Sequence, residues 1–558
     1  MSNDMNCQYQ KWLRKNDNTV GEKRNAIEKG ITGEKSVFPL ISVVILASKS
    51  GIDIIEPVVN SVLNQDTDQW FMVIIENRLF AHDVKEYLKQ LSEEDHRIIT
   101  IKSEENEAVS QVLNKVINNL ESKYVLVLEE IGVLRPNAIR LFAREARESN
   151  YPDLIYADED KLNIAVGHRS DPIFKPGWSP NLLYSFNYIG SPVIIRKELL
   201  QELGGFREHY GSCLNFDLLL RLTGQKLNVS RIPQVLFSKI INVSCKDDLE
   251  IKECQELWAI RESFLRRGYE SRVTKGKEMG TFNYRLNIRK AEPVSIIIPT
   301  KNNAEVLRRC LESIEDKSTY SNYEVIVIDN GSNEENTLNY LKSLEGMKGF
   351  KILKYPEEFN YPDINNLGAA EARGSHLVFL NDDTEVISSD WLEALLEHSQ
   401  RPEIGAVGAL LLFPNGMIQH AGVVVGMRGS ASHAFYKSDG KSPGYMNLAV
   451  CVRNVSAVTA ACMMIEKTKF NKVRGFNTSF RVAMNDIDLC IRLLEEGFYN
   501  IYTPHARLLH HESLTRGEFI NEEEIKLFTT AHKEFLKKGD PYYHPALSLE
   551  RNDYSLAV

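Results

Sequence analysis

Two adjacent carboxylates, Asp382 and Asp383, directly follow an apolar run at 376–380 in the second half of the chain. Neighbouring carboxylates repel each other unless a positive charge lies between them. A divalent cation suits such a position, because hard cations take oxygen ligands and often keep substrate phosphates in their coordination shell. The pair therefore suggests a metal-bound diphosphate, although an Asp-Asp pair is by itself unspecific.

Two further predicted strands end in polar, turn-forming residues. The strand at 294–299 leads into Thr300, Lys301 and Asn302, and the strand at 324–329 ends at Asp329, before an Asn-Gly-Ser turn. A carboxylate at a strand end can accept hydrogen bonds from a base or from the hydroxyl groups of a ribose. Taken alone, however, Asp-Asn-Gly is more often only a turn.

An expected helix begins with two more acids, Asp486 and Asp488. An acid in the first turn stabilises a helix, and Asp488 lies four residues before Arg492, so we assign Asp488 this structural role. Asp486 is then free to act as a general base that takes the proton of a hydroxyl nucleophile.

A pair of histidines, His510 and His511, ends the strand-like run 506–509. An imidazole there could complete the ligand set of the cation at Asp383. A surface histidine pair alone would indicate nothing. The choice between the two stays open, and we take His510 because it is nearer the strand.

The elements that must position these residues occur twice in the chain, with Ser42 of the first copy on Ser295 of the second. Three further pairs of segments align at similar spacing: 71–77 with 324–330, 124–132 with 376–384, and 214–222 with 485–493. In each copy, short apolar strands alternate with helical segments, which predicts βαβ units and a mainly parallel sheet. Such sheets bind ligands at the carboxyl ends of their strands.

The composition indicates a folded protein with more than one domain. The chain has 558 residues, well beyond the ~250 to 300 of a single core, and is 43% hydrophobic and 26% charged. Its net charge of −9 comes from intermixed signs, which excludes a basic field that grips nucleic acid. Eight cysteines without C-x-x-C spacing, and a polar N-terminus without a signal-peptide core, predict a reduced, cytoplasmic protein. The longest apolar stretch, 404–413, is about half of the ~20 residues of a membrane-spanning helix, so any membrane contact is expected to be peripheral.

We expect five segments in the chain: a polar extension at 1–38, a first domain at 39–245, a linker of helix and strand at 246–291, a second domain at 292–520, and a C-terminal helix and tail at 521–558. Four residues of the linker recur at helical spacing: Ile251, Cys254, Trp258 and Leu265. This stripe predicts an amphipathic helix at 246–270 that packs through it. Near the end, Asn521 with Glu524 resembles an N-cap pair and Gly539 a helix stop, which predicts one terminal helix.

Together with these strand ends, four stretches resemble bacterial members of glycosyltransferase family 2 that build O-antigen and related surface polysaccharides: 359–386, 418–424, 456–465 and 508–513. The match covers most of 292–520, and as a set the motifs are specific. The resemblance implies two tandem domains of the α/β GT-A fold with mainly parallel sheets. It also implies inverting transfer of a sugar from a nucleotide-sugar, a UDP- or dTDP-sugar, to a glycan hydroxyl, with Mn²⁺ or Mg²⁺ as cofactor. The acceptor is expected to be lipid-linked, at the inner face of the cell membrane.

The resemblance also assigns roles to residues. It implies that Asp486 is the catalytic base, that Asp383 and His510 bind the metal at the diphosphate, and that Asp329 contacts the nucleoside. The nucleotide-sugar is expected to contact Pro299, Thr300, Lys301, Asn302, Asp329, Asn330, Asn366, Arg373 and Asp382.

The first half resembles the same family through three stretches: 156–163, 174–190 and 203–208. At the chemical positions, the internal alignment places Glu76 at Asp329, Ile131 at Asp383, Asn215 at Asp486, and 237–239 near the histidines. Isoleucine cannot bind a cation and asparagine cannot take a proton near neutral pH, so we expect a degenerate, non-catalytic domain. Glu129 and Glu130 remain at the strand end, which leaves residual activity as the disfavoured alternative.

Three other functions compete with a single active site. A bifunctional polysaccharide polymerase requires a complete acid set in both halves, and Asn215 argues against it. A glycan-binding scaffold without turnover does not need the acids that the second half retains. A nucleotide-dependent dehydrogenase requires G-x-G-x-x-G after the first strand, which neither copy has. The sequence indicates neither the acceptor nor an oligomeric state.

Overall fold

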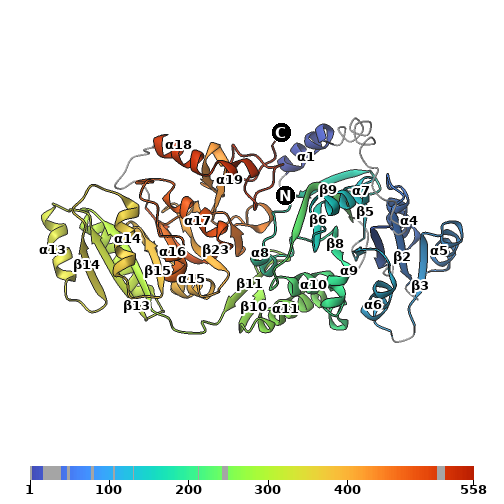
Figure 1. Ribbon diagram of the computed structural model, residues 1–558, viewed down its shortest axis with the longest axis horizontal. Coiled ribbons are helices and arrows are strands. Elements are labelled where there is room, and N and C mark those ends of the chain that lie inside the picture. The colour runs from blue at the N-terminus through green and yellow to red at the C-terminus, as the bar shows by residue number, and fades with distance from the viewer. Residues whose placement is uncertain are drawn as a thin grey trace.

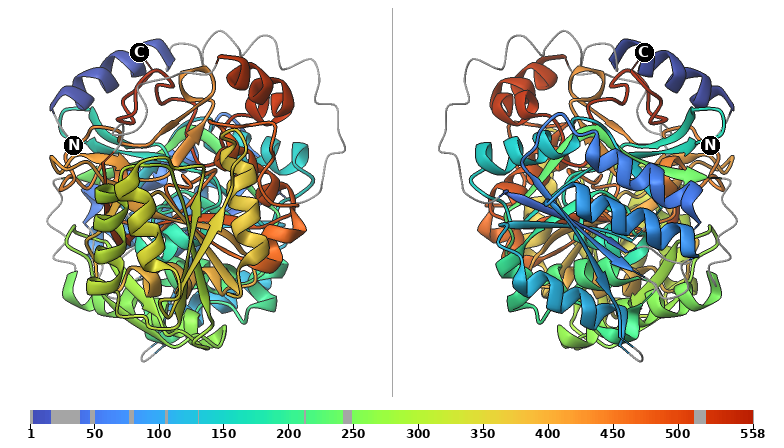
Figure 2. Two further views of the ribbon diagram at one scale, coloured as in Figure 1. Left: turned by 90° about the vertical axis from the view of Figure 1, so that its left-hand side faces the viewer. Right: turned by 90° about the vertical axis from the view of Figure 1, so that its right-hand side faces the viewer.

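The computed structural model describes residues 3–16, 39–46, 51–76, 81–104, 107–129, 131–211, 213–241, 249–511 and 522–557. The two halves of the chain lie side by side along the long axis, with the second half on the left of Figure 1 and the first half on the right. Each half is built on one large twisted sheet, and helices cover both of its faces in the end-on views of Figure 2.

The first sheet has the strand order β3-β2-β1-β4-β8-β6-β9-β5, and β7 pairs with β6. Its strands are β1 (Ile41–Leu46), β2 (Trp70–Glu76), β3 (Ile98–Lys102), β4 (Tyr124–Leu128), β5 (Gly132–Leu134), β6 (Leu154–Asn163), β7 (His168–Ile173), β8 (Val193–Arg196) and β9 (Val229–Ile241). The helices of this half are α4 (Ile52–Leu63), α5 (His82–Glu94), α6 (Val109–Asn119), α7 (Ala138–Glu148), α8 (Pro180–Ser185), α9 (Lys197–Glu202), η1 (Glu208–Tyr210) and α10 (Leu214–Leu222).

The second sheet has the order β14-β13-β12-β15-β22-β17-β23-β16, with β18 on β17 and β21 on β23. Its strands are β12 (Val294–Thr300), β13 (Tyr323–Asp329), β14 (Phe350–Lys354), β15 (His376–Leu380), β16 (Thr384–Val386), β17 (Ile404–Leu412), β18 (Ile418–His420), β21 (Arg453–Val455), β22 (Cys462–Glu466) and β23 (Tyr499–His510). A separate antiparallel pair consists of β19 (Val423–Val425) and β20 (Ala431–His433). The helices are α12 (Ala304–Lys317), α13 (Glu335–Leu344), α14 (Tyr361–Glu371), α15 (Trp391–Ser399), η2 (Met427–Gly429), η3 (Tyr445–Asn447), α16 (Lys467–Lys472) and α17 (Asn485–Glu495).

The two strand orders correspond strand for strand, which confirms the internal repeat. In each sheet the first four strands of the order are parallel, as their continuous apolar runs predict. β8 and β22 run antiparallel to their neighbours, and so do the short β5 and β16. The prediction of tandem α/β domains with mainly parallel sheets is therefore confirmed, and the antiparallel strands are an addition that the alternation of elements did not reveal.

A buried polar interface joins the two halves. Asn454 Oδ1 accepts hydrogen bonds of 3.0 Å from Ser179 Oγ and from the backbone N–H of Asn181. His544, in the C-terminal tail, lies 2.7 Å from Asp158 of the first sheet, and both side chains are buried. One apolar core extends through both halves. The stretch 174–190 thus contributes residues to this interface as well as to its own domain.

The linker contains α11 (Leu249–Arg266) and a hairpin of β10 (Ser271–Lys275) and β11 (Phe282–Leu286). The helix is present, but the prediction of its packing face is wrong. All four residues of the predicted stripe are exposed. Half or more of the surface of three side chains is accessible, with 50% for Ile251, 64% for Trp258 and 66% for Leu265, and Cys254 is also exposed. The opposite side, with Ala259, Ile260 and Phe264, is fully buried. Both stripes have helical spacing, so periodicity alone could not tell which one meets the core.

Both ends of the chain add short helices. α1 (Asn3–Asn16) packs on β7, and Tyr9 donates a 2.6 Å hydrogen bond to Asp160, so part of the predicted polar extension is folded. The predicted single terminal helix is instead two, α18 (Glu522–Ala531) and α19 (Lys533–Lys538), and Gly539 follows with a φ of 78°. Asn521, the predicted N-cap, lies outside the described residues. Within the described ranges, no helix is long and apolar enough to cross a bilayer.

Candidate active site

Asp383 and His510 are brought together at the carboxyl end of β15. The pairing of β16 with β23 places His510 opposite Thr384, directly beside Asp383. His510 Nε2 lies 3.0 Å from Asp383 Oδ1, and both side chains are buried. Burial opposes ionisation of Asp383, but a proton on His510 Nε2, a backbone hydrogen bond and the nearby His511 together outweigh it, so the pKa of this carboxyl is lowered.

The tautomer of His510 is fixed from its other side. His510 Nδ1 lies 2.7 Å from Gln419 Oε1, an acceptor, so the Nδ1–H donates to Gln419. Asn381 Nδ2 lies 3.2 Å from His510 Nε2. His511 faces elsewhere, because its Nε2 lies 2.8 Å from Glu385 Oε1. Of the two histidines, the geometry therefore brings only the imidazole of His510 to the Asp383 carboxylate, while His511 donates its backbone N–H to the Asp383 carbonyl.

These contacts fit a cation between Asp383 and His510. With its proton on Nδ1, the imidazole presents the lone pair of Nε2 toward the Asp383 carboxylate, and Asp383 Oδ1 is buried without an aligned hydrogen bond. Two such acceptors at 3.0 Å require a proton or a metal ion between them. Among the described residues, no group of three or more His, Cys, Asp or Glu side chains gathers at one point. A divalent ion held here would thus take its other ligands from water and phosphate oxygens, as Mg²⁺ commonly does.

Asp486 lies in the first turn of α17 and is partly exposed. Its Oδ2 accepts a 3.1 Å hydrogen bond from the backbone N–H of Ala460, and its Oδ1 accepts one of 2.9 Å from Ile487. Met484, directly before the helix, has a φ of 62°, a strained conformation for a side chain of this size. The carboxylate is therefore held in one orientation by backbone donors from two elements.

Asp488, two residues further on, has the structural role that the sequence indicated. Arg492 Nη2 lies 2.7 Å from Asp488 Oδ2, and His532 Nε2 lies 2.9 Å from Asp488 Oδ1. Asp488 is buried, with 3% of its surface exposed, and so does not reach the cavity that Asp486 faces. The first half keeps the same pair, with Arg221 3.2 Å from Asp217.

Asp486 and His510 line one cavity of about 220 Å³. The residues that complete its wall are Tyr361, Asn381, Gln419, His433, Thr459, Ala460, Ala461, Val482, Ala483, Met484 and Asn485. The base and the metal ligand predicted from separate motifs are thus neighbours in space, across a hollow that can hold reacting groups.

The predicted nucleotide-binding residues meet at the next strand ends. Thr300 and Asp329 are register partners, and Thr300 Oγ1 donates a 2.8 Å hydrogen bond to Asp382. Asp329 Oδ1 accepts from the backbone N–H of Ser332 at 2.8 Å, so the Asp-Asn-Gly segment is also a turn. Asn330 holds the following loop by donating to two backbone carbonyls at 355 and 357.

The remaining predicted residues divide into two groups. Asn302 shapes the loop after β12, with a φ of 58° and a hydrogen bond from the backbone N–H of Asn333 to its side chain. Lys301 is exposed in the same loop, and Pro299 lies within β12. Asn366 and Arg373 are not brought to the site.

Asn366 and Arg373 instead make structural contacts. Asn366 exchanges two hydrogen bonds with the backbone of Phe476, at 2.9 and 3.0 Å. Arg373 pairs with Glu324 at 2.8 Å, at the amino ends of β13 and β15, the opposite edge of the sheet from Asp383. Their positions give no support to a role in nucleotide-sugar binding.

The first half lacks this constellation at the same places. The pairing of β5 with β9 puts Lys239 opposite Gly132, which is the position of His510 in the second sheet, and Ile131 takes the place of Asp383. Asn215 replaces Asp486, and its backbone N–H donates a 2.7 Å hydrogen bond to Glu129 Oε1. This remaining acid is therefore used to hold the start of α10. Glu130 lies outside the described residues.

Sequence reasoning missed two contributors to the second site. Gln419 fixes His510, and His433 lines the cavity and lies 3.0 Å from His420, measured between the Nδ1 atoms. Gln419 falls within 418–424, one of the stretches that carried the family resemblance, so two adjacent polar residues, Gln419 and His420, in an otherwise apolar motif were the available signal.

Comparisons with known proteins agree with this picture. The model of glycosyl transferase family 2 matches residues 42–204 and 295–473. The chain is 35% identical to the uncharacterized protein y4gI of Sinorhizobium fredii, over 93% of this chain and 59% of that protein. It is 33% identical to the O-antigen biosynthesis protein RfbC of Myxococcus xanthus, over 93% of this chain and 41% of that protein. The chain thus spans only about half the length of these relatives.

Among solved structures, GalNAc-T7 with UDP, GalNAc and Mn²⁺ aligns with a TM-score of 0.37 and 15% identity, over 48% of this chain and 52% of that one. The two family matches are more informative, because each lies on one of the two sheets and together they exceed half of the chain. The resemblance drawn from the motifs, with its tandem GT-A domains, is thereby confirmed. The chain belongs to glycosyl transferase family 2.

Proposed function

We propose that the chain transfers a sugar, with inversion at the anomeric carbon, from a UDP- or dTDP-sugar to a hydroxyl group of a glycan, and that residues 292–520 catalyse this reaction. The observation that carries the proposal is that Asp486 and His510 line one cavity of about 220 Å³, while His510 also contacts Asp383 at 3.0 Å. The family membership supports sugar transfer, and the geometry supports the assignment of the three side chains.

Asp486 would act as the general base. As the acceptor oxygen forms its bond to the anomeric carbon, the hydroxyl proton passes to a carboxylate oxygen of Asp486 and the bond from that carbon to the diphosphate breaks. The backbone N–H groups of Ala460 and Ile487 hold the carboxylate in place for this transfer. Attack from the side opposite the leaving diphosphate inverts the configuration.

Asp383 and His510 would hold a Mn²⁺ or Mg²⁺ ion, which supplies stabilisation of the negative charge on the departing diphosphate. Asp329, Asn330 and Thr300 are our candidates for the nucleoside side of the donor site. Their position supports this role, because Thr300 and Asp329 lie at adjacent strand ends and Thr300 bonds to Asp382. Protein-bound nucleotides commonly occupy this edge of a parallel sheet.

The first domain, residues 39–245, would be non-catalytic. Its three replacements, Ile131, Lys239 and Asn215, remove a metal ligand, an imidazole and a base together. The extension at 1–38, the linker at 246–291 and the tail at 521–558 would then support the catalytic domain, which begins at 292.

The acceptor would be a growing glycan of a cell-surface polysaccharide, carried on a lipid. The similarity to a protein named for O-antigen biosynthesis supports this class of product. A lipid-linked acceptor would place the reaction at the cytoplasmic face of the membrane, with peripheral contact.

The test is nucleoside diphosphate release from a panel of UDP- and dTDP-sugars, with Mn²⁺ or Mg²⁺ and water as the acceptor. A positioned base is worth ~10² to 10⁴ in rate, so Asp486→Asn should lose at least 100-fold. The matched control in the first half is Glu129→Gln, which keeps the hydrogen-bond acceptor and should leave release unchanged. Near-normal release by Asp486→Asn would reject the base. Loss of release by Glu129→Gln would instead favour a bifunctional polymerase with two active domains.

A further inference from the structure

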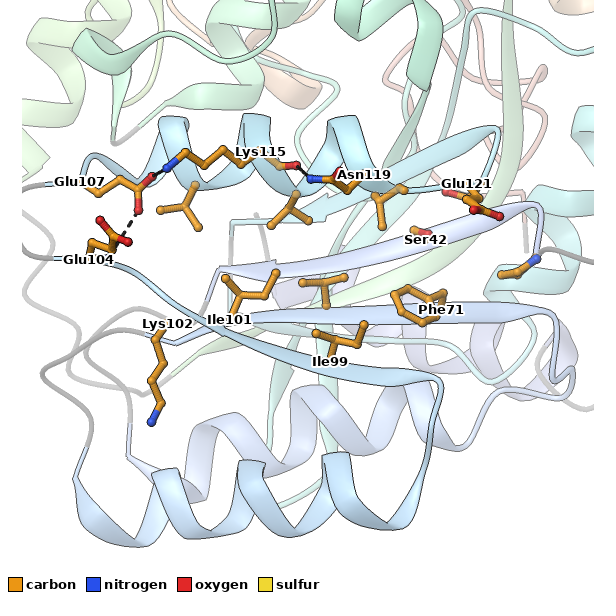
Figure 3. Close-up of a pocket in the computed structure, with 16 residues that line it drawn as sticks. Ser42, Phe71, Ile99, Ile101, Lys102, Glu104, Glu107, Lys115, Asn119 and Glu121 are labelled. Atoms are coloured by element: carbon orange, nitrogen blue, oxygen red, sulfur yellow. Dashed lines mark hydrogen bonds and ion pairs between the residues drawn. The ribbon is translucent and has the colours of Figure 1, made fainter.

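A second cavity, of about 530 Å³, lies in the first half, between α6 and the strands β1, β2 and β3. Figure 3 shows side chains from the helix and from the strands directed toward each other across it. The apolar side chains of its lining are Pro39, Phe71, Val73, Ile99, Ile101, Val112, Val116 and Leu120. Its volume falls within the ~300 to 1,000 Å³ of known ligand sites. It is separate from the site above, which belongs to the second half.

The second half shows why this space is open in the first. α6 and α14 are equivalent, because Asn114 exchanges with the backbone of Phe206 the same two hydrogen bonds that Asn366 exchanges with Phe476. In this alignment Val116 stands where α14 has Gly368.

Gly368 permits close packing of α14 on its sheet. A Cβ at Gly368 would lie 2.5 Å from Ile297 and 2.8 Å from Ile328, distances that a side chain cannot occupy. The equivalent sheet positions of the first half are also aliphatic, with Val44 and Ile75. A valine in place of the glycine must therefore hold α6 further from β1 and β2, which produces the gap.

In the second half, a polar cluster lies at the amino ends of β13 and β15, where the equivalent strand ends of the first half border the cavity. Glu324 accepts from Ser295 Oγ at 2.7 Å and pairs with Arg373 at 2.8 Å. In the first half these two charged positions are Phe71 and Glu121, and both line the cavity. The ion pair is thus replaced by an aromatic ring and an acid, which cannot form it. Two independent changes, at the helix and at the strand ends, act in the same direction.

The lining determines the kind of ligand that fits. Most polar side chains lie near the two ends of the cavity, and Asn119 between them already donates to the backbone carbonyl of Lys115, so the middle offers little for a sugar or a base to bond. At one end of the cavity, Lys115 forms an ion pair with Glu107. Its positive charge is therefore balanced and does not favour binding of an anionic ligand. An unbranched apolar chain gains from burial along these walls without needing a partner.

We propose that this cavity binds the aliphatic chain of an amphiphile, with the polar head group at the surface. The proposal does not rest on the donor, the metal or the base of the second half. Two sources could supply this aliphatic chain. One is the lipid of a lipid-linked acceptor, and the other is a free fatty acid that binds to the first domain.

The test is calorimetric titration of the full chain with straight-chain alkyl phosphates and fatty acids of eight to twelve carbons, below their micelle concentrations. Burial of each methylene predicts about four-fold tighter binding, until the cavity is full. The head group that binds more tightly identifies the source, a phosphate-linked lipid or a fatty acid. Saturation at one probe per chain is expected.

Val116→Phe and Ile99→Phe both fill the cavity and should weaken binding of the twelve-carbon probe at least ten-fold. Two variants are used because the buried Val116 could fail to fold, whereas Ile99 is 43% exposed. The control is Leu338→Phe on α13, outside the cavity and 45% exposed, which should bind as wild type.

Diphosphate release by folded Ile99→Phe should remain, and Asp486→Asn should still bind the probe, so this inference and the proposed function fail separately. An affinity independent of chain length, or equal in the filled variants, would overturn the lipid site. Binding of UMP that the filled variants lose would make the cavity a nucleotide site instead. Loss of self-association in Ile99→Phe, without any probe binding to wild type, would make it an interface between copies.

Discussion

Gln419 provides the sharpest test of how the second site is built. It is 4% exposed, and its Oε1 lies 2.7 Å from His510 Nδ1, which holds a proton there and leaves Nε2 as a ligand directed at Asp383. Gln419→Leu keeps approximately the volume but removes the acceptor. The Nδ1–H is then buried without a partner, and the tautomer with the proton on Nε2 is no longer disfavoured.

The magnitude follows from this loss of orientation. Groups that fix a metal-binding histidine typically contribute 10- to 100-fold to metal affinity, so we expect Gln419→Leu to weaken Mn²⁺ binding by about this factor. The orphaned buried N–H should also lower the free energy of unfolding by ~1 to 3 kcal/mol.

The assay is Mn²⁺ titration followed by electron paramagnetic resonance in the presence of UDP, together with urea unfolding. Gln419→Glu is the matched control, because it retains an acceptor at the same place and should bind Mn²⁺ at least as well as wild type. If Gln419→Leu binds Mn²⁺ within two-fold of wild type while remaining folded, His510 does not depend on Gln419. The proposed metal site would then be wrong in this respect.

Three further substitutions test other contacts. His532→Ala removes the 2.9 Å contact with buried Asp488 and should lower the free energy of unfolding by ~1 to 3 kcal/mol in urea titrations, whereas the exposed Lys533→Ala should not. Burial, and then neighbouring positive charges, hold the pKa of His398 well below its usual range, so only the unfolded chain gains this proton below pH ~6.5. Wild type should therefore lose stability from pH 7.5 to 5.5, and His398→Phe should lose less in parallel urea titrations. Arg373→Ala breaks the contact with Glu324 and should leave diphosphate release unchanged; a clear loss would restore the predicted donor-binding role.

The repeat and the parallel strands were predictable because they rest on local pattern. The apolar runs that became β1 and β12 share their spacing to the next strand, and a parallel sheet buries such runs on both faces. The packing face of α11 was not predictable. Its exposed Trp258 and its buried Phe264 belong to different stripes of the same helical period, and only the neighbouring elements decide which stripe is covered.

The candidate site shows the same division. The placement of Asp383, His510 and Asp486 could be predicted because each lies at an end of an element: Asp383 between β15 and β16, His510 at the end of β23, and Asp486 in the first turn of α17. The contact of Gln419 with His510 depends on how the short β18 lies against β17, and no local pattern encodes that register. Arg373 was predicted to contact the nucleotide-sugar, but it lies at the other end of β15 from Asp383, in contact with Glu324.

The two halves together separate what the fold needs from what the chemistry needs. Asp217 and Arg221 keep the buried ion pair that Asp488 and Arg492 make in the second half, so this pair stabilises the helix whether or not a base precedes it. Two residues earlier, Asn215 uses its backbone to bind Glu129, a contact that leaves no free carboxylate at the base position. The first domain therefore retains the packing of the fold while its chemical positions serve structure. Because its large cavity arises from other substitutions, on α6 and at the strand ends, a binding role for this domain needs none of the residues that catalysis would require.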